Sequence, residues 1–352
     1  MMTSQAVPVG LETVTCDLCR SDKTEFVLRQ RDLLHGVSSQ EFDLVRCAGC
    51  GLLYLNPRPT MTEIGRYYPE QYFTQPVPKP RSDLERTAKR WSGRVKRWIM
   101  EDFYGYPSAS SLPWPARFLR KLLLWPERIR RVWRGKDILP WIGEGRLLDV
   151  GCGPGVNLLM FQEQGWDVQA IEMSQAAAAQ AKAKVGDRIH VGILATAPFP
   201  PESFDVVWLS HTLEHLFSPT EELGRVCRLL KPAGRLVITV PNAGSFESRL
   251  FGRWWFPLEL PRHLYHFEKS TLTTLLERSG FRVVSVKTGV GSLYFMVSLD
   301  RAWQQRFQCP VPLRRVVEKL IAKPVCLLTG HLGYGTELTV HAMKTQAEGR
   351  SA

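Results

Sequence analysis

The segment 146–172 constrains the fold most, because a glycine-rich turn there joins a predicted strand to a predicted helix. The strand is expected over Arg146–Val150 (RLLDV) and the helix over Val156–Gln164. The glycines between them allow a tight turn and a close approach of the backbone to a ligand. A second strand, Asp167–Glu172, ends in a carboxylate that can accept both hydrogen bonds of a ribose diol. The segment therefore predicts a nucleotide-like ligand at the ends of two neighbouring strands.

Strand and helix signals continue to alternate after this segment. Ser174 is expected to cap an Ala-rich helix. Further strands are predicted at 189–191, 204–209, 235–240, 281–287 and 337–343, and further helices at 219–230 and 270–279. Continuous apolar strands that alternate with helices indicate a parallel sheet covered on both faces. We therefore expect an α/β, doubly wound, Rossmann-like sheet with its ligand site at the carboxyl ends of the strands.

The spacing of the glycines distinguishes two cofactors. A dinucleotide fingerprint needs G-x-G-x-x-G, whereas this loop reads G-x-G-x-G and has Val156 at the next position. The region of about Gly145–Val240 resembles class I S-adenosylmethionine (SAM)-dependent methyltransferases. The resemblance is carried by LLDVGCGPG, by Glu172 before Met173-Ser174, by FPPESFDVVWLSHTLEHL and by RLLKPAGRLVITVPN, in this order.

This resemblance implies a donor site. Glu172 would hold the ribose hydroxyls and Met173 would lie against the adenine, although Met173 could also be core packing. The methionine and ribose parts of SAM would be lined by Asp149, Gly151, Gly153 and Gly155. Many relatives carry an acid after the third strand, whereas this chain reads Gly192-Ile-Leu-Ala-Thr-Ala, so the contact to the adenine amino group must come from the backbone or be absent.

Candidate catalytic groups gather after the fourth and the fifth strand. A base is needed only if the methyl acceptor must lose a proton. The candidates are His211, Glu214, His215, His263 and His266, with Arg262 and Tyr265 in a region that relatives use to cover the substrate. The pair Glu214-His215 could instead shape a turn, or could bind a divalent ion as has been proposed for a similar pattern in quinone-type relatives. Either of the later histidines could be structural.

Two pairs of cysteines near the start of the chain indicate a metal site. Cys16-x-x-Cys19 and Cys47-x-x-Cys50 supply four thiolates, and zinc prefers four tetrahedral ligands. Because we find no export signal, we expect metal binding rather than disulfides. The 27 residues between the pairs can hold a hairpin, with 25–28 against 42–46. A zinc ribbon of this kind leaves no open coordination position, so its role should be structural.

The residues after the ribbon extend the resemblance. Asn56-Pro-Arg-Pro and the following tyrosines, ahead of a SAM domain, are similar to a bacterial methyltransferase group that includes sugar C-methyltransferases and accompanies surface-polysaccharide synthesis. In those relatives the N-terminal module helps to close the substrate pocket. Tyr68 and Tyr72 are therefore candidate substrate contacts, with packing on the ribbon as the alternative.

A basic, Trp-rich insert separates the ribbon from the SAM domain. Between Lys79 and Lys136 the chain has 16 Lys and Arg, 5 Asp and Glu, and 5 Trp. Apolar residues recur there at helical spacing, and Pro126 should start a second helix or kink the first. The insert could lie on an anionic membrane surface, bind nucleic acid or form a helical lid. We find no RNA-binding motif. The amphipathic stretch Leu313–Leu328 fits membrane docking or packing on the insert.

These features predict four parts: 1–75 (ribbon and tail), 76–142 (insert), 143–245 (SAM core) and 246–352 (completion of the sheet with substrate-covering and helical insertions). The expected function is methyl transfer to a small or carrier-linked acceptor, and the resemblance favours a sugar or polysaccharide intermediate. An O-methyltransferase of an aromatic or quinone-like acceptor and a non-catalytic SAM-binding scaffold are the alternatives. We find no secretory signal or transmembrane run, so we expect a cytoplasmic protein. If the insert docks on a membrane, the contact would be at the inner membrane face.

Overall fold

The computed structural model describes residues 9–69, 72, 83–108, 112–135 and 138–345, with the backbone alone for 83–92. The chain divides into two compact units. The first unit comprises Met1–Thr74 and Arg146–Ala352, and the second comprises Gln75–Gly145.

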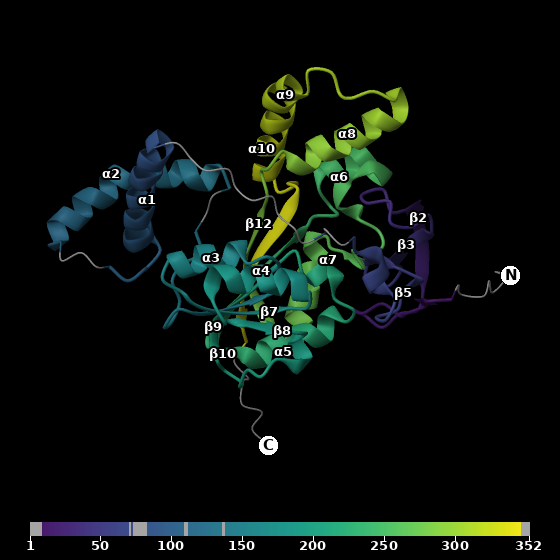
Figure 1. The fold of residues 1–352 in the computed structure, drawn as a ribbon, viewed down its shortest axis with the longest axis horizontal. Coiled ribbons are helices and arrows are strands. Elements are labelled where there is room, and N and C mark those ends of the chain that lie inside the picture. Colours follow the sequence, from purple (N-terminus) through teal and green to yellow (C-terminus); the bar gives the residue numbers. More distant parts are fainter. Residues whose placement is uncertain (1–8, 70–71, 73–82, 109–111, 136–137, 346–352) are drawn as a thin grey trace. The chain divides into compact units, whose positions relative to one another are not determined.

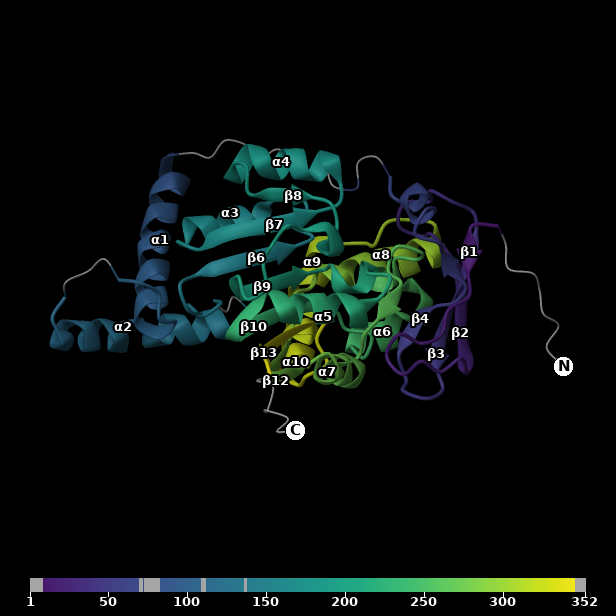
Figure 2. The ribbon, with the colours of Figure 1, turned by 90° about the horizontal axis from the view of Figure 1, so that it is seen from below.

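A sheet of seven strands forms the centre of the first unit (Figure 1), in the order β12-β13-β10-β9-β6-β7-β8. Its parallel strands are β6 (Arg146–Val150), β7 (Asp167–Glu172), β8 (Ile189–Val191), β9 (Phe204–Ser210) and β10 (Leu230–Pro241). The last strands, β12 (Phe281–Thr288) and β13 (Glu337–Lys344), are antiparallel to their neighbours. Figure 2 shows the strands in this succession. This arrangement confirms the predicted α/β fold.

The helices that accompany the sheet also follow the predicted pattern. They are α3 (Val156–Glu163), α4 (Gln175–Val185), α5 (Pro219–Leu229) and α7 (Lys269–Arg278). The hydroxyl of Ser174 accepts a hydrogen bond from the Ala177 amide (3.3 Å), which confirms the predicted cap of α4. One boundary differs, because β10 begins at Leu230 directly after α5. Lys-Pro-Ala-Gly therefore lies inside a strand whose register shifts between Leu230 and Arg235.

The N-terminal module carries a sheet of four strands, in the order β11-β4-β3-β2. The predicted hairpin is confirmed as β2 (Thr24–Arg31) paired with β3 (Glu41–Cys47). The fourth strand, β11 (Tyr265–His266), comes from the far end of the chain and pairs antiparallel with β4 (Leu53–Leu55). Short strands β1 (Leu11–Glu12) and β5 (Arg58–Pro59) pair beside this sheet.

Polar contacts join the module to the unit of the seven-stranded sheet. Asp17, in the first cysteine turn, accepts hydrogen bonds from the Thr220 amide (2.8 Å) and from the Ser218 hydroxyl (3.0 Å) at the start of α5. Arg58 donates to the carbonyl of Phe217 (2.8 Å). These contacts end on the loop between β9 and α5, so the module is built onto the edge of the sheet where a ligand site is expected.

Between β10 and β13 the chain forms additional helices on the first unit. They are α6 (Phe246–Phe251), α8 (Leu293–Phe307), α9 (Arg314–Val317) and α10 (Lys323–His331), with one π-helical stretch at Glu318–Ala322. The stretch Leu313–Leu328 therefore starts just before α9 and ends within α10. Its buried residues Ala322 and Cys326 pack with Phe295 and Met296 of α8.

The second unit contains two helices that contact each other, α1 (Asp83–Phe103) and α2 (Trp114–Trp133). Pro126 lies inside α2, which continues as one helix to Trp133. Of the two outcomes expected for this proline, the start of a separate helix is therefore wrong. No helix among the described residues is long and apolar enough to span a membrane.

Candidate functional site

The loop that follows β6 contains three glycines, and one of them borders open space. Gly151, Gly153 and Gly155 all have positive φ angles, of 75°, 53° and 76°. A Cβ at Gly151 would lie 2.6 Å from Thr212 Oγ1, and a Cβ at Gly155 would lie 2.9 Å from Ala181. A Cβ at Gly153 would meet nothing within 4 Å. Two of the glycines are therefore required by packing, whereas the third borders open space that a ligand could occupy.

Two acids border this loop. Glu172, at the end of β7, accepts hydrogen bonds from the amides of Gly153 and Ser174, both at 2.8 Å. Asp149, in β6, is buried, and its Oδ2 has no hydrogen-bond partner among the described residues. Burial and then the negative charge of Glu172 raise the pKa of Asp149 to about 7. A buried, unpaired acid of this kind is ready to receive a cationic or donor group of a ligand.

These residues fit SAM. The carboxylate oxygens of Glu172 each retain acceptor capacity for a ribose hydroxyl, and Oδ2 of Asp149 is without a partner. Met173 is 64% exposed, so it is not core packing and is placed where it could lie against a flat ring. Gly153 leaves the space that the donor requires.

A cluster of histidines and acids lies beside the glycine loop, because Thr212 donates a hydrogen bond to the Val150 carbonyl (2.9 Å). His211 has a positive φ of 53° and lies between two carboxylates. Its Nδ1 is 3.4 Å from Glu214 Oε1, and its Nε2 is 3.3 Å from Glu337 Oε1. Burial alone would lower the pKa of His211, but both carboxylates outweigh it and raise the pKa to about 10. Both carboxylates therefore favour the protonated ring of His211, and the role of His211 as a base stays a prediction.

Glu214, in the short helix Leu213–His215, is the buried acid of the cluster. It is 1% exposed, and neither of its carboxylate oxygens has a hydrogen-bond partner among the described residues. Burial favours a raised pKa, but the nearby protonated ring of His211, 3.4 Å away, and the other histidines of the cluster hold the pKa of Glu214 below its ordinary value. Glu214 is therefore a fixed negative charge beneath the histidines.

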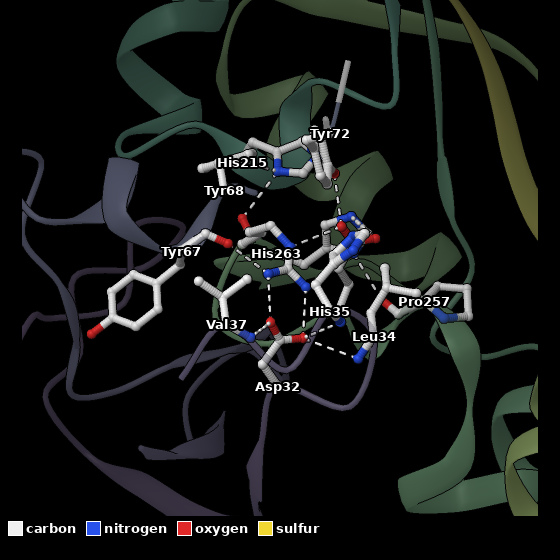
Figure 3. Close-up of polar contacts among 12 residues, drawn as sticks. Asp32, Leu34, His35, Val37, Tyr67, Tyr68, Tyr72, His215, Pro257 and His263 are labelled. Carbon is white, nitrogen blue, oxygen red and sulfur yellow. Dashed lines mark hydrogen bonds and ion pairs between the residues drawn. The ribbon is translucent and has the colours of Figure 1, made fainter. Parts of the chain in front are cut away.

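His215 and His263 are held in one orientation each by backbone carbonyls (Figure 3). Nδ1 of His215 lies 3.0 Å from the Arg262 carbonyl oxygen, and Nδ1 of His263 lies 2.8 Å from the Pro257 carbonyl oxygen. Because a carbonyl only accepts, each Nδ1 carries the proton and each Nε2 has a lone pair when the ring is neutral. The two ring centres are 4.6 Å apart. His263 is buried, and burial followed by the charge of His215 lowers its pKa well below the ordinary value. His215 is the more accessible of the two.

Tyrosines from the N-terminal module reach this cluster. The hydroxyl of Tyr68 lies 3.2 Å from Nδ1 of His215, and the hydroxyl of Tyr72 donates to Glu259 Oε1 (2.7 Å). The two tyrosine rings pack edge to face at 4.9 Å. Tyr68 and Tyr72 are therefore brought to the candidate catalytic groups.

Arg262, Tyr265 and His266 have other surroundings. The Arg262 guanidinium is fully buried and donates to both carboxylate oxygens of Asp32 (2.9 and 2.8 Å). Asp32 also accepts hydrogen bonds from the backbone amides of Leu34, His35 and Val37 (Figure 3). Tyr265 donates to the Phe217 carbonyl (3.1 Å). His266 Nε2 donates to the Leu258 carbonyl (2.9 Å), and burial lowers its pKa to about 4. These side chains are buried in the fold around the cluster, and the role of Arg262 and Tyr265 in substrate contact stays a prediction.

Two groups of side chains among the described residues could hold a metal ion. The four ligand atoms of Cys16, Cys19, Cys47 and Cys50 lie within 4.8 Å of one another, with Sγ–Sγ distances of 3.5 Å (Cys16–Cys50) and 3.4 Å (Cys19–Cys47). A tetrahedral zinc with bonds of about 2.3 Å separates its sulfurs by about 3.8 Å, so the cluster fits zinc. The second group is Glu214, His215 and His263.

Sequence reasoning missed Glu337, Glu259 and Asp32. Asp32 and Glu337 are far along the chain from the histidines, whereas Glu259 precedes His263 by four residues, and all three lie outside the motifs that carry the resemblance. Glu337 begins β13 and pairs with His211, whereas Glu259 and Asp32 both bind Arg262. No local pattern marks these acids, because their roles depend on strand order and on the fold of the N-terminal module.

Comparisons with known proteins agree with this geometry. Residues 117–286, slightly less than half of the chain, match the family described as a methyltransferase domain. A ubiquinone biosynthesis O-methyltransferase of Rhodopseudomonas palustris (strain TIE-1) is 29% identical over 163 residues, covering 44% of this chain and 64% of that protein. A probable S-adenosylmethionine-dependent methyltransferase of Mycolicibacterium smegmatis is 31% identical over 139 residues, covering 39% of this chain and 52% of that protein.

Among solved structures, a SAM-dependent methyltransferase from Mesorhizobium loti is similar with a TM-score of 0.41 and 21% identity, covering 62% of this chain and 97% of that one. The matches to the two curated relatives span less than two thirds of the length of those proteins.

The sheet order, the glycine loop with its two acids and the family match together show that this chain contains a class I SAM-dependent methyltransferase domain. An N-terminal four-cysteine module consistent with a zinc ribbon precedes this domain in the chain. The expected link with sugars or polysaccharides is unsupported by these relatives.

Proposed function

We propose that this chain transfers a methyl group from SAM to a hydroxyl oxygen of an aromatic or quinone-like acceptor. The supporting observation is His215, which forms one cluster with the buried acid Glu214 and with His263, their ligand-type atoms within 4.8 Å of one another, on the loop that touches the glycine turn. A base so placed suits an acceptor that must lose a proton, as a hydroxyl does. The relative from Rhodopseudomonas palustris is described as an O-methyltransferase, which supports the same choice.

Different residues of the chain would bind the donor, accept the proton and stabilise the charge. SAM, when bound, supplies an electrophilic methyl group on a positively charged sulfur. Asp149 and Glu172 would hold and orient the donor, and Gly153 would leave space for it. His215 Nε2 would accept the proton of the acceptor hydroxyl while Nδ1–H stays on the Arg262 carbonyl. Glu214 would stabilise the imidazolium that results, because a buried carboxylate interacts strongly with a new neighbouring cation even when it already lies beside His211.

A sugar or polysaccharide intermediate remains the second candidate acceptor. The observation that favours it is the polar wall that Tyr68, Tyr72 and Glu259 add to the site, since hydroxyl-rich ligands need many hydrogen-bonding partners. Incubation with SAM and with matched panels of catechols, hydroquinones, nucleotide-linked sugars and lipid-linked sugars would separate the two, with the methylated position read by mass spectrometry.

The proposed base is tested by single variants. We expect His215→Ala and Glu214→Gln to lower turnover by about 100-fold or more, the usual contribution of a positioned base, while SAM affinity changes little. Glu221→Gln, an exposed acid in the first turn of α5, is the matched control. Unchanged turnover in His215→Ala would return the cluster to a structural role. Loss of activity on mild chelation that leaves the zinc of the cysteine module in place, and that an added divalent ion restores, would assign Glu214, His215 and His263 to metal binding instead.

A SAM-binding scaffold without turnover is the remaining alternative. Release of S-adenosylhomocysteine in the presence of any acceptor would eliminate it. Tight binding of S-adenosylhomocysteine without turnover across both panels would support it.

We also propose that the four-cysteine module holds one structural zinc. Four thiolates at these separations complete a tetrahedron, so the ion would have no position left for a substrate. Metal analysis of the purified chain should find one zinc per chain, and Cys47→Ser should lose it. Cys309→Ser, at an exposed cysteine outside the module, should retain it.

A further inference from the structure

The helix α2 packs against α1 through basic side chains. Arg120 donates to both carboxylate oxygens of Asp102 on α1 (2.8 Å each), and its Nη2 also lies 3.3 Å from Glu101. Arg128 stacks on the rings of Phe103 and Trp125, with its guanidinium carbon 5.2 and 5.3 Å from the ring centres. Acids and aromatic rings of α1 therefore occupy the polar face of α2, which is the face that an ordinary surface helix turns to water.

The apolar side of α2 lies beside the face that contacts α1, and Trp125 of this side has a ring contact with Phe103 of α1, with ring centres 5.8 Å apart. Residues at spacings of three and four form one stripe along the helix, consisting of Trp114, Phe118, Leu122, Trp125, Ile129 and Val132. All six are exposed, with Trp114 at 80%, Phe118 at 66% and Leu122 at 62%. Leu119 and Leu123 widen the stripe and are exposed as well. No residue of α2 is buried. A continuous apolar stripe of this size on the surface marks an interaction site.

Charge identifies the chemistry of the partner. The second unit, Gln75–Gly145, has 16 Lys and Arg against 7 Asp and Glu, a net charge of +9 within a chain of +12. The only acid of α2, Glu127, is shared by Arg130 and Arg131 (2.7 and 2.9 Å). Lys121 and Arg130 are exposed on opposite sides of the apolar stripe. The partner should therefore be apolar in its interior and negatively charged on its surface.

We propose that α2 lies in the surface of an anionic lipid bilayer, with its apolar stripe in the interface and its flanking cations at the phosphates. Amphipathic helices with Trp, Phe and Leu on one face and Lys or Arg beside it bind such surfaces in this orientation. A second copy of the chain fits less well, because two units of +9 repel. A nucleic acid would need the cationic face outward, whereas Arg120 and Arg128 are turned to α1.

Vesicle flotation of the full chain tests this inference without any measurement of turnover. We expect binding to vesicles that contain about one third phosphatidylglycerol, little binding to pure phosphatidylcholine, and release by high salt, because the cation contribution is screened. Phe118→Ser together with Leu122→Ser should weaken binding about tenfold or more. Lys121→Glu together with Arg130→Glu should abolish the preference for the anionic vesicles.

Leu328→Ser is the matched control, since Leu328 on α10 is also 62% exposed, and it should bind vesicles as the unchanged chain does. Helix content from circular dichroism reports whether each variant is folded, because the substitutions on α2 lie in the second unit and the donor site lies in the first. Equal flotation of the Phe118/Leu122 variant, or no flotation of the unchanged chain, would overturn the proposal. So would a concentration-dependent dimer that the same variant loses, or RNA binding that competes with the vesicles. None of these outcomes bears on the proposed O-methylation.

Discussion

At the scale of single residues, the sequence predicts the position of Asp149 but not its protonation state. The motif locates this acid at the end of β6, but its charge depends on burial and on Glu172, which approaches from the next strand. The same holds for His211, which the motif includes as a candidate base. Its cationic state follows from Glu337, a residue 126 positions later (337 − 211) that only the strand order brings near. Local sequence patterns predict residue types and their spacing. Protonation states could not be predicted from them, because they depend on charged partners that only the folded sheet brings near.

Asp149 should release a proton when the donor binds. Its pKa of about 7 in the free chain is raised by burial and by Glu172, and a cationic ligand beside it would lower that pKa. Below pH 7 part of the population is protonated, so binding of SAM near pH 6.5 should expel protons. The calorimetric enthalpy should then vary with the ionisation enthalpy of the buffer. Asp149→Asn should abolish this dependence, and a persistent buffer effect in that variant would assign the proton to another group.

Gly153→Arg should abolish binding of S-adenosylhomocysteine while the chain keeps its metal. The side chain would project into the open face of the glycine loop, where a Cβ meets nothing within 4 Å. Gly165→Arg is a matched control, because Gly165 also has a positive φ and open space but precedes β7, at the amino end of the sheet. Calorimetry and zinc analysis of both variants provide the check. Normal affinity in Gly153→Arg would disprove the donor site.

At the scale of elements, the sequence gives accurate strands and helices in the SAM core but little about how elements far apart meet. Strands such as Arg146–Val150 and Asp167–Glu172 form as predicted because their apolar runs are continuous and their ends carry Gly or Ser. The pairing of β11 with β4 could not be predicted, since a strand of two residues has no periodicity. Neither could the bond from Asp17 to α5, because a capping residue is normally sought just before its own helix.

Asp17→Ala should destabilise the chain by about 1 kcal/mol, the usual cost of removing a helix cap. The carboxylate of Asp17 accepts from the Thr220 amide and hydroxyl and from Ser218, and the Ser218 side chain makes no capping hydrogen bond of its own. Chemical denaturation of the variant measures the difference. Asp22→Ala, an exposed acid on the same module, should leave the stability unchanged, and an equal loss in both would refute the capping role.

Asp32→Ala should cost about 3–5 kcal/mol of unfolding free energy, because it leaves the buried Arg262 guanidinium without its main partner. Burial favours a raised pKa for Asp32, but Arg262 and the backbone amides outweigh it and lower the pKa to about 2. In an unfolded chain the same acid titrates near about 4. The stabilisation is therefore complete above about pH 4 and is lost as the pH falls toward 2. Denaturation of the chain and of Asp32→Asn across this range should show the extra acid sensitivity only in the unchanged protein.

At the scale of the whole molecule, donor and acceptor sides come from different parts of the chain. Asp149, Gly153 and Glu172 belong to the central sheet, whereas Tyr68 and Tyr72 come from the N-terminal module. The sequence identifies both parts from their motifs. Residues such as Arg58 and Arg262 form the hydrogen bonds between the two parts. Their partners could not be predicted, because they belong to no recognised motif.

Removal of the metal should therefore lower turnover but leave the affinity for S-adenosylhomocysteine nearly unchanged. Chelation is expected to unfold the cysteine turns and to withdraw Tyr68 and the Asp17 cap, so turnover should fall at least tenfold. Affinity for S-adenosylhomocysteine should change little, because the donor site contains no residue of the module. Parallel calorimetry and rate measurements before and after chelation give the comparison, with zinc added back as the reversal. Equal loss of both would mean that the module also supports the donor site.

The strand β11 is synthesised long after β4, so the four-stranded sheet of the N-terminal module can be completed only late in synthesis. Tyr54 of β4 pairs with Tyr265, which is 211 residues later in the chain (265 − 54). At a synthesis rate of about 5–20 residues per second, roughly 10–40 s pass between the two strands. During this interval the edge of β4 has no partner and is open to other chains. All four cysteines are made before the interval begins, so a metal could be captured early, but the sheet around it is completed only when the catalytic part has nearly been made.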